Sequence, residues 1–110
     1  MAVNEDYLSF IEDQMSAFAP FVSKKMFGGI GFFKEGIMFG MIGGNIFRLR
    51  VDETNKNDFE EHGIKNGYLA DAKKKGMPYW EVPIAIVEDK DELIHWLTKA
   101  YAISVKAKKK

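Results

Sequence analysis

The sequence predicts an α+β domain in two layers, an antiparallel five-stranded sheet with helices, in the order α-β-β-β-α-β-β-α. Three observations support this prediction. Apolar residues recur at helical spacing near both ends of the chain and with a period of two in its middle. Glycine-containing turns, which are typical of hairpins, separate the alternating stretches. The 110 residues contain no internal repeat or linker, so we expect one domain.

The first predicted helix begins after Asn4, a residue type that caps helices well, and ends before Pro20. Glu5 and Asp6 follow the cap, where the positive end of the helix dipole stabilises carboxylates. The apolar residues of this segment recur every three or four positions, and they are Tyr7, Leu8, Ile11, Met15 and Phe18. This pattern predicts a helix with one side packed on the sheet.

Three strands are predicted next, at residues 25–34, 37–42 and 46–51, with turns at Glu35-Gly36 and Gly43-Gly44-Asn45. If Glu35-Gly36 and Gly43-Gly44 are two-residue turns, Phe33 lies opposite Met38. The same geometry places Gly40 opposite Gly31 on one side and opposite Phe47 on the other.

The second half of the chain predicts a short helix, two strands and a long helix. Residues 52–55 offer caps for a short helix that contains Phe59 and ends at Gly63. Strands are predicted at 68–72 and 78–82, the latter at a sheet edge because of its prolines. Asp89 and Glu92 resemble a capping box before the last helix, whose apolar side is Leu93, Trp96, Leu97, Ala100 and Tyr101. The domain is predicted over residues 1–105, with 106–110 as a lysine-rich tail.

Composition and charge exclude several function classes. Without cysteine, the chain holds no disulfide, thiolate nucleophile or zinc–thiolate site. Four of its 16 basic side chains lie in residues 106–110, so acidic residues outnumber basic ones in the rest. That balance is unusual for a nucleic-acid-binding domain. No targeting segment is visible and no stretch approaches the roughly 18 apolar residues of a membrane span, so we expect a cytoplasmic protein.

Both faces of the predicted sheet carry large apolar side chains, whereas a one-sided antiparallel sheet alternates them with polar residues. One face is predicted to hold Phe33, Met38, Ile42, Phe47 and Leu49. The other is the candidate interaction surface: Ile30, Phe32, Phe39, Met41, Ile46, Arg48 and Arg50. Either helices cover both faces, or a partner covers the arginine-edged one.

The sequence contains no convincing catalytic or metal-binding constellation. The glycines at 28, 29 and 31 lack phosphate-loop spacing, and His62 and His95 lack a second histidine at ligand spacing. We therefore expect no enzyme, cofactor or metal. One basic collection is an alternative nucleic-acid contact, formed by Arg48 and Arg50 with Lys24, Lys25, Lys73, Lys74 and Lys75.

Four segments carry a resemblance to a known family. Residues 24–33 read KKMFGGIGFF, 36–42 read GIMFGMI, 47–52 read FRLRVD and 77–83 read MPYWEVP. Together with Asp91, Glu92, Leu93 and Trp96 in the last helix, this string resembles the N-terminal domain of the TfoX (Sxy) family, regulators of natural competence. The resemblance covers about residues 5–104.

The resemblance implies a non-enzymatic α+β domain whose fold is similar to that of type III secretion chaperones. It also implies a regulatory role in DNA transformation competence, alongside the cyclic-AMP receptor protein, here as a stand-alone domain. The partners that we expect are a protein, with a transcription factor as the candidate, and a second copy of the chain in a homodimer. Direct nucleic-acid binding is the alternative, and no membrane association is expected.

Overall fold

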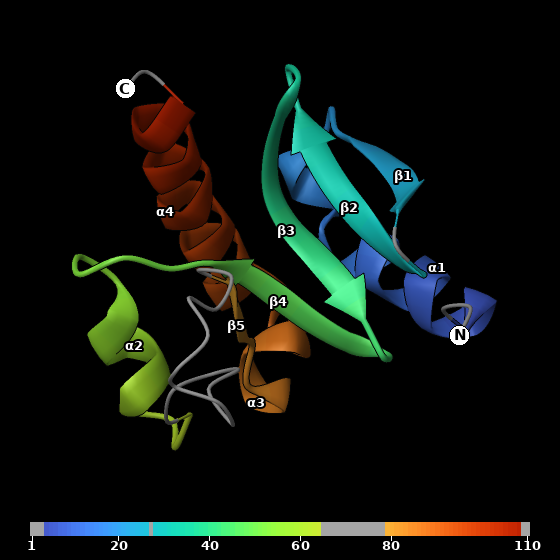
Figure 1. Cartoon of the computed structure of the whole chain (residues 1–110). Helices are drawn as coiled ribbons and strands as arrows, with labels where there is room; N and C mark the ends of the chain where they lie inside the picture. The colour runs from blue at the N-terminus through green and yellow to red at the C-terminus, as the bar shows by residue number, and fades with distance from the viewer. Residues whose placement is uncertain (1–3, 27, 65–78, 109–110) are drawn as a thin grey trace.

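One antiparallel sheet with its strands in chain order, β1-β2-β3-β4-β5, organises the computed structural model, which describes residues 4–26, 28–64 and 79–108. The strands are β1 (Val22–Met26), β2 (Gly29–Lys34), β3 (Ile37–Gly43), β4 (Ile46–Arg50) and β5 (Tyr79–Glu81). The helices are α1 (Glu5–Gln14), the 3-10 helix η1 (Ser16–Phe18), α2 (Lys56–Glu60), α3 (Ile84–Val87) and α4 (Lys90–Lys108). The predicted α+β class with a five-stranded antiparallel sheet is therefore confirmed (Figure 1).

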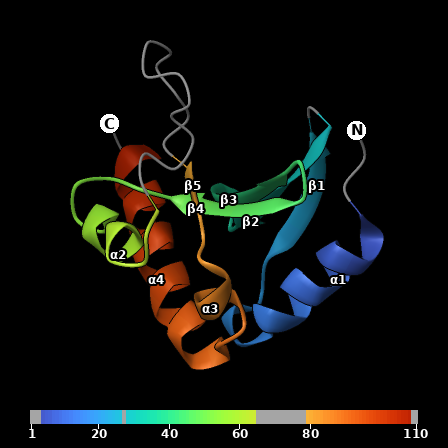
Figure 2. The ribbon, with the colours of Figure 1, turned by 90° about the horizontal axis from the view of Figure 1, so that it is seen from below.

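The helices α1, α3 and α4 lie on one side of the sheet, which we call the first face (Figure 2). The other side, the second face, carries no helix among the residues that the structure describes. Helix α2 packs against α4: the rings of Phe59 and Trp96 lie 4.7 Å apart, and Lys99 Nζ contacts Asp58 Oδ2 at 2.7 Å. The described part of the molecule thus has a one-sided helical layer.

Helix α1 begins as its sequence predicts. The side-chain oxygen of Asn4 accepts hydrogen bonds from the backbone N–H groups of Asp6 and Tyr7, which satisfies two otherwise free donors. The α-helix ends at Gln14, earlier than the expected end before Pro20, and η1 forms the remaining turn.

The first predicted strand, at 25–34, is wrong because it is a hairpin of two strands. Gly28 has a φ of 79°, a left-handed conformation that glycine adopts without strain, and it lies between β1 and β2. Four strands therefore precede α2 instead of three. The strand predicted at 68–72 lies outside the described residues. The strand predicted at 78–82 is confirmed as β5 at a sheet edge.

The register of β2 and β3 follows the prediction at the turn and departs from it beyond. Phe33 pairs with Met38 as expected, but the pairing then shifts, and Gly40 lies opposite Phe32 instead of Gly31. Phe39 is the extra residue of a β-bulge. The next turn consists of Gly44 and Asn45, both at positive φ. Phe47 therefore pairs with Ile42 and not with Gly40.

The bulge determines which side chains enter the core. Phe39 and Gly40 both face the helices, because Phe39 is fully buried and a Cβ at Gly40 would meet Leu49 and Phe47. The Phe39 ring lies 5.3 Å from Phe18 of η1 and 6.3 Å from Tyr101 of α4. An aromatic cluster thereby joins the first face to the helices that cover it. The sheet residues of this core are Ile30, Phe32, Phe39, Ile42, Phe47, Leu49 and Trp80.

Helix α4 confirms most of what its sequence predicts. The Asp89 carboxylate accepts a hydrogen bond from the backbone N–H of Glu92, as in a capping box. Four of the five predicted apolar residues are buried, and Tyr101 is half-buried. The helix continues to Lys108 and so includes the first three residues of the predicted lysine-rich tail. The short helix α3 was not predicted.

Candidate interaction surface

The second face is a continuous row of side chains across all five strands. Lys24 pairs with Gly31, Gly31 with Met41, Met41 with Arg48, and Arg48 with Glu81. Paired residues share a face, so this row crosses the side away from the helices. The full second face consists of Val22, Lys24, Met26, Gly29, Gly31, Phe33, Met38, Met41, Gly43, Ile46, Arg48, Arg50, Tyr79 and Glu81.

Sulfur-containing and aromatic side chains converge over Gly31. A Cβ at this position would lie 2.5 Å from Met26 Sδ, 3.0 Å from Phe33 Cε1 and 3.5 Å from Met38 Sδ. The glycine therefore provides the space that these half-buried side chains occupy. Thioether side chains adapt their shape to a contacting group, which suits a binding surface.

Basic groups lie beside aromatic rings at both ends of the second face. Lys24 Nζ lies 5.3 Å from the ring centre of Phe33, and Arg50 Cζ lies 5.6 Å from that of Tyr79. Both distances are in the range of cation–π attraction. The second face therefore combines apolar area with positive charge.

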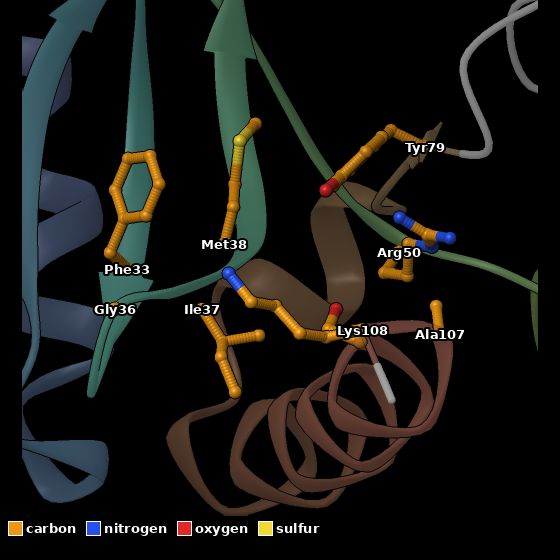
Figure 3. A pocket seen from close by; sticks show the side chains of 9 residues that line it. Phe33, Gly36, Ile37, Met38, Arg50, Tyr79, Ala107 and Lys108 are labelled. Carbon is orange, nitrogen blue, oxygen red and sulfur yellow. The ribbon is translucent and has the colours of Figure 1, made fainter. Parts of the chain in front are cut away.

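A pocket of about 360 Å³ lies where the second face meets the last turn of α4 (Figure 3). It is lined by Phe33, Gly36, Ile37, Met38, Arg50, Tyr79, Ser104, Ala107 and Lys108. The Nε of Arg50 is buried and has no hydrogen-bond partner among the described residues. A second hollow of about 290 Å³ lies between α4 and the β4–α2 connection, next to Asp52 and Lys106.

Asp52, beside that second hollow, has a perturbed carboxyl group. Burial raises its pKa, but hydrogen bonds from the Thr54 hydroxyl and backbone N–H, with the positive charges of Lys106 and Arg50, outweigh burial. The net effect is a pKa below the ordinary value of an aspartate. Asp52 is therefore held as a carboxylate and does not resemble a general acid.

The structure divides the predicted interaction surface between the two faces. Ile30, Phe32 and Phe39 are buried beneath the helices, so their placement on an exposed surface is wrong. The cause is the bulge at Phe39, which changes the alternation along β3. Met41, Ile46, Arg48 and Arg50 do share the second face, and their role in binding stays a prediction.

The predicted nucleic-acid contacts are also divided. Lys24 lies on the second face with Arg48 and Arg50, but Lys25 pairs with Ile30 in the row that faces the helices. Lys73, Lys74 and Lys75 lie outside the described residues. Of the four residues of this set that the structure describes, three lie on the same face of the sheet.

Sequence reasoning missed Phe33, Met38, Tyr79 and Lys108 as residues of one site. Phe33 and Met38 were assigned to the covered face because the hairpin geometry was continued without a bulge. Tyr79 and Lys108 come from β5 and α4, and their approach to Arg50 depends on the tertiary fold. Nothing in the local sequence signals that approach.

The described residues contain no group of three or more His, Cys, Asp or Glu side chains that could hold a metal ion. His62 Nδ1 lies 3.0 Å from the Asp58 carbonyl oxygen, and His95 Nδ1 lies 3.8 Å from Glu92 on the exposed side of α4. No helix in the described ranges is long and apolar enough to cross a membrane.

The comparisons with known proteins identify a family for this chain. The family model of the TfoX N-terminal domain matches residues 13–104, which is most of the chain. No curated protein sequence matches. The matched range includes the whole sheet, α2, α3 and most of α4. The chain therefore belongs to the TfoX N-terminal domain family.

Proposed function

We propose that this chain is a cytoplasmic, non-enzymatic regulatory domain that acts by binding another protein through the second face of its sheet. The partner class that the family suggests is a transcription factor, in the context of DNA transformation competence. Family membership and the one-sided helical layer support this proposal. The observation that carries it is the row of half-buried Met, Ile and Arg side chains on the second face.

The chemistry of the second face fits a protein partner. Met38, Met41 and Ile46 supply adaptable apolar area at its centre, while Arg48 and Arg50 supply charge beside it. Interfaces typically combine an apolar centre with a polar rim, and both methionine and arginine are enriched in them. We therefore expect the partner to offer apolar side chains flanked by carboxylates.

The test compares Met41→Asp with Ile84→Asp. Met41 lies at the centre of the second face, whereas Ile84 is 72% exposed on α3 and serves as a control of the same chemical kind. Tagged chain is used to capture partners, and any DNA-binding protein recovered is purified and titrated against each variant. We expect Met41→Asp to weaken binding at least about tenfold, because a buried unpaired carboxylate is costly, and Ile84→Asp to leave it unchanged.

Circular dichroism and thermal unfolding must show that both variants are folded. Equal binding by a folded Met41→Asp variant would refute the second face as the contact. Recovery of no regulatory protein, with the second face fully accessible to a solvent probe, would refute the proposed class of partner.

A second candidate function is direct binding of single-stranded nucleic acid. Lys24 and Arg50 each lie beside an aromatic ring on the second face, and such pairs bind bases and phosphates together. Fluorescence anisotropy with a labelled oligonucleotide should then show affinity that falls steeply as salt rises. Arg48→Gln combined with Arg50→Gln should reduce both the affinity and its salt dependence. Binding that is absent at low salt refutes this candidate.

A further inference from the structure

We infer that the pocket between the second face and the end of α4 binds a small carboxylate that carries an apolar body. The pocket shares Met38 and Arg50 with the proposed protein contact, but Met41, at the centre of that contact, does not line it. Its residues come from three separate parts of the chain: the β2–β3 hairpin, the paired ends of β4 and β5, and the last turns of α4.

Arg50 provides the strongest reason for an anionic ligand. Its Nε is buried without a hydrogen-bond partner among the described residues, although buried donors are nearly always paired. A rotation of the Arg50 side chain toward the pocket that it lines would expose this donor to a ligand oxygen, which would recover the free energy that the unpaired donor costs. The planar guanidinium offers parallel donors that match the two oxygens of a carboxylate. Arg50, which lines the pocket, therefore carries a donor that lacks its acceptor.

Two further polar groups line the same pocket. Figure 3 shows the Tyr79 hydroxyl directed toward the region between Met38 and Arg50, and the Lys108 ammonium group beside Ile37 and Met38. Tyr79 is 6% exposed, and its ring centre lies 5.6 Å from Arg50 Cζ. A carboxylate seated there would meet the Arg50 guanidinium and the Tyr79 hydroxyl, with the Lys108 ammonium group at the edge of the pocket.

The rest of the lining requires an apolar body on the ligand. Phe33, Ile37 and Met38 form one wall of the pocket, opposite Arg50 and Tyr79 (Figure 3). A volume of about 360 Å³ lies at the small end of the usual range for ligand pockets. This size fits a single ring or a short aliphatic chain, and not a nucleotide.

The end of α4 favours one negative charge over two. Ser104, Ala107 and Lys108 belong to the last turns of the helix, whose free carbonyl groups make that end partly negative. Arg50 and Lys108 offset this potential for a monoanion. A phosphate dianion would meet a larger repulsion from the same carbonyl groups, so the site discriminates toward a carboxylate.

The test is a titration of the intact chain followed by NMR, with 3-phenylpropionate as the probe. We expect shifts at the Arg50 Nε–H and the Met38 methyl group that saturate with ligand. The neutral isostere 3-phenylpropanamide and acetate should each bind at least about tenfold more weakly, because one lacks the charge and the other the apolar body. Inorganic phosphate should compete poorly.

Two matched pairs of variants locate the contact. Arg50→Gln should weaken binding of 3-phenylpropionate at least about tenfold, whereas Arg48→Gln, two residues away on the same strand, should change it less than twofold. Lys108→Gln should weaken binding about threefold, and Lys106→Gln, in the same helical turn but outside this pocket, should not. Lys108→Gln keeps the test decisive if Arg50→Gln fails to fold.

Two further measurements complete the test. One compares ligands to show whether the carboxylate belongs to a polypeptide end or to a free acid, and the other separates this proposal from the proposed function. N-acetyl-phenylalanine represents the carboxyl end of a polypeptide, and its tighter binding than 3-phenylpropionate would assign the site to a chain end. Tighter binding of 3-phenylpropionate would assign it to a free acid. Met41→Asp should leave both affinities unchanged. Equal affinity for acid and amide, or shifts that do not depend on Arg50 and Lys108, would overturn the inference.

Discussion

At the residue scale, two glycines of neighbouring strands differ in the space that surrounds them: a side chain does not fit at Gly29 but fits at Gly43. A Cβ at Gly29 would collide with the backbone carbonyl oxygen of Ile42, which cannot move without breaking the β2–β3 pairing. A Cβ at Gly43 would meet only the flexible end of Met41, at an ordinary contact distance of 3.5 Å. The same substitution should therefore have different effects at the two positions.

We predict that Gly29→Ala lowers the free energy of unfolding by about 1–3 kcal/mol through this overlap. Gly43→Ala should leave that free energy unchanged or raise it by up to about 1 kcal/mol, because alanine restricts the unfolded chain. Urea denaturation followed by circular dichroism measures both. Equal effects of the two substitutions would show that the backbone of β2 and β3 is not as close as the structure has it.

Local chemistry made some residues predictable and left others out of reach. The caps at Asn4 and Asp89 and the turn at Glu35-Gly36 depend on neighbours within four residues, and each prediction is confirmed. Asn55 is different. Its buried side-chain amide accepts a hydrogen bond from the backbone N–H of Asp52 and donates one to the carbonyl oxygen of Arg50. Residue type identified 52–55 as a capping region, but not this tie to the end of β4.

At the element scale, the periodicity of the sequence predicted the positions of β3, β4 and β5 better than the faces on which their side chains lie. A single extra residue at Phe39 reverses which neighbours share a face, and alternating apolar residues do not reveal a bulge when both faces are apolar. The merged strand at 25–34 has the same origin, because apolar residues continue through the turn at Gly28. Glycine at this position was the available signal.

The contact between α1 and α3 gives an element-scale prediction. Gln14 is 8% exposed, and its Nε2 donates a 2.8 Å hydrogen bond to the Val87 carbonyl oxygen. Gln14→Ala should lower the free energy of unfolding by about 1–3 kcal/mol, because that buried acceptor loses its donor. The control is Asp13→Ala, which removes an exposed ion pair with Lys90 and should cost less than about 1 kcal/mol.

Hydrogen exchange can show that the Gln14 effect belongs to this contact. Loss of the tie should increase exchange in α1 and α3 more than in the β2–β3 hairpin, because opening then becomes local. A uniform increase across the sheet would mean that Gln14 acts on global stability and not on the docking of α1.

At the scale of the whole molecule, the candidate site could not be assembled from the sequence. Arg50, Tyr79 and Lys108 are separated by 28 residues or more along the chain and meet because β5 pairs with β4 and α4 passes beneath the sheet. The predicted homodimer depended on an exposed Phe39 surface, and the structure removes that basis by burying Phe39 within one chain. Whether the chain self-associates through the second face stays a prediction.

Phe39 and Met41 distinguish a core residue from a surface residue in one experiment. Phe39 is fully buried between η1, β2 and α4, with four aromatic neighbours. Phe39→Ala should therefore lower the free energy of unfolding by about 3–5 kcal/mol, a large part of the 5–15 kcal/mol typical of a domain. Met41→Ala, on the half-buried second face, should cost about 1 kcal/mol. The free energy of unfolding of each variant is measured by denaturation, and its molecular mass in solution by light scattering.

The contradicting outcome would be a Phe39→Ala variant that keeps its free energy of unfolding and changes its molecular mass in solution. Phe39 would then lie at an interface between copies, and the helices would not cover the first face as described above.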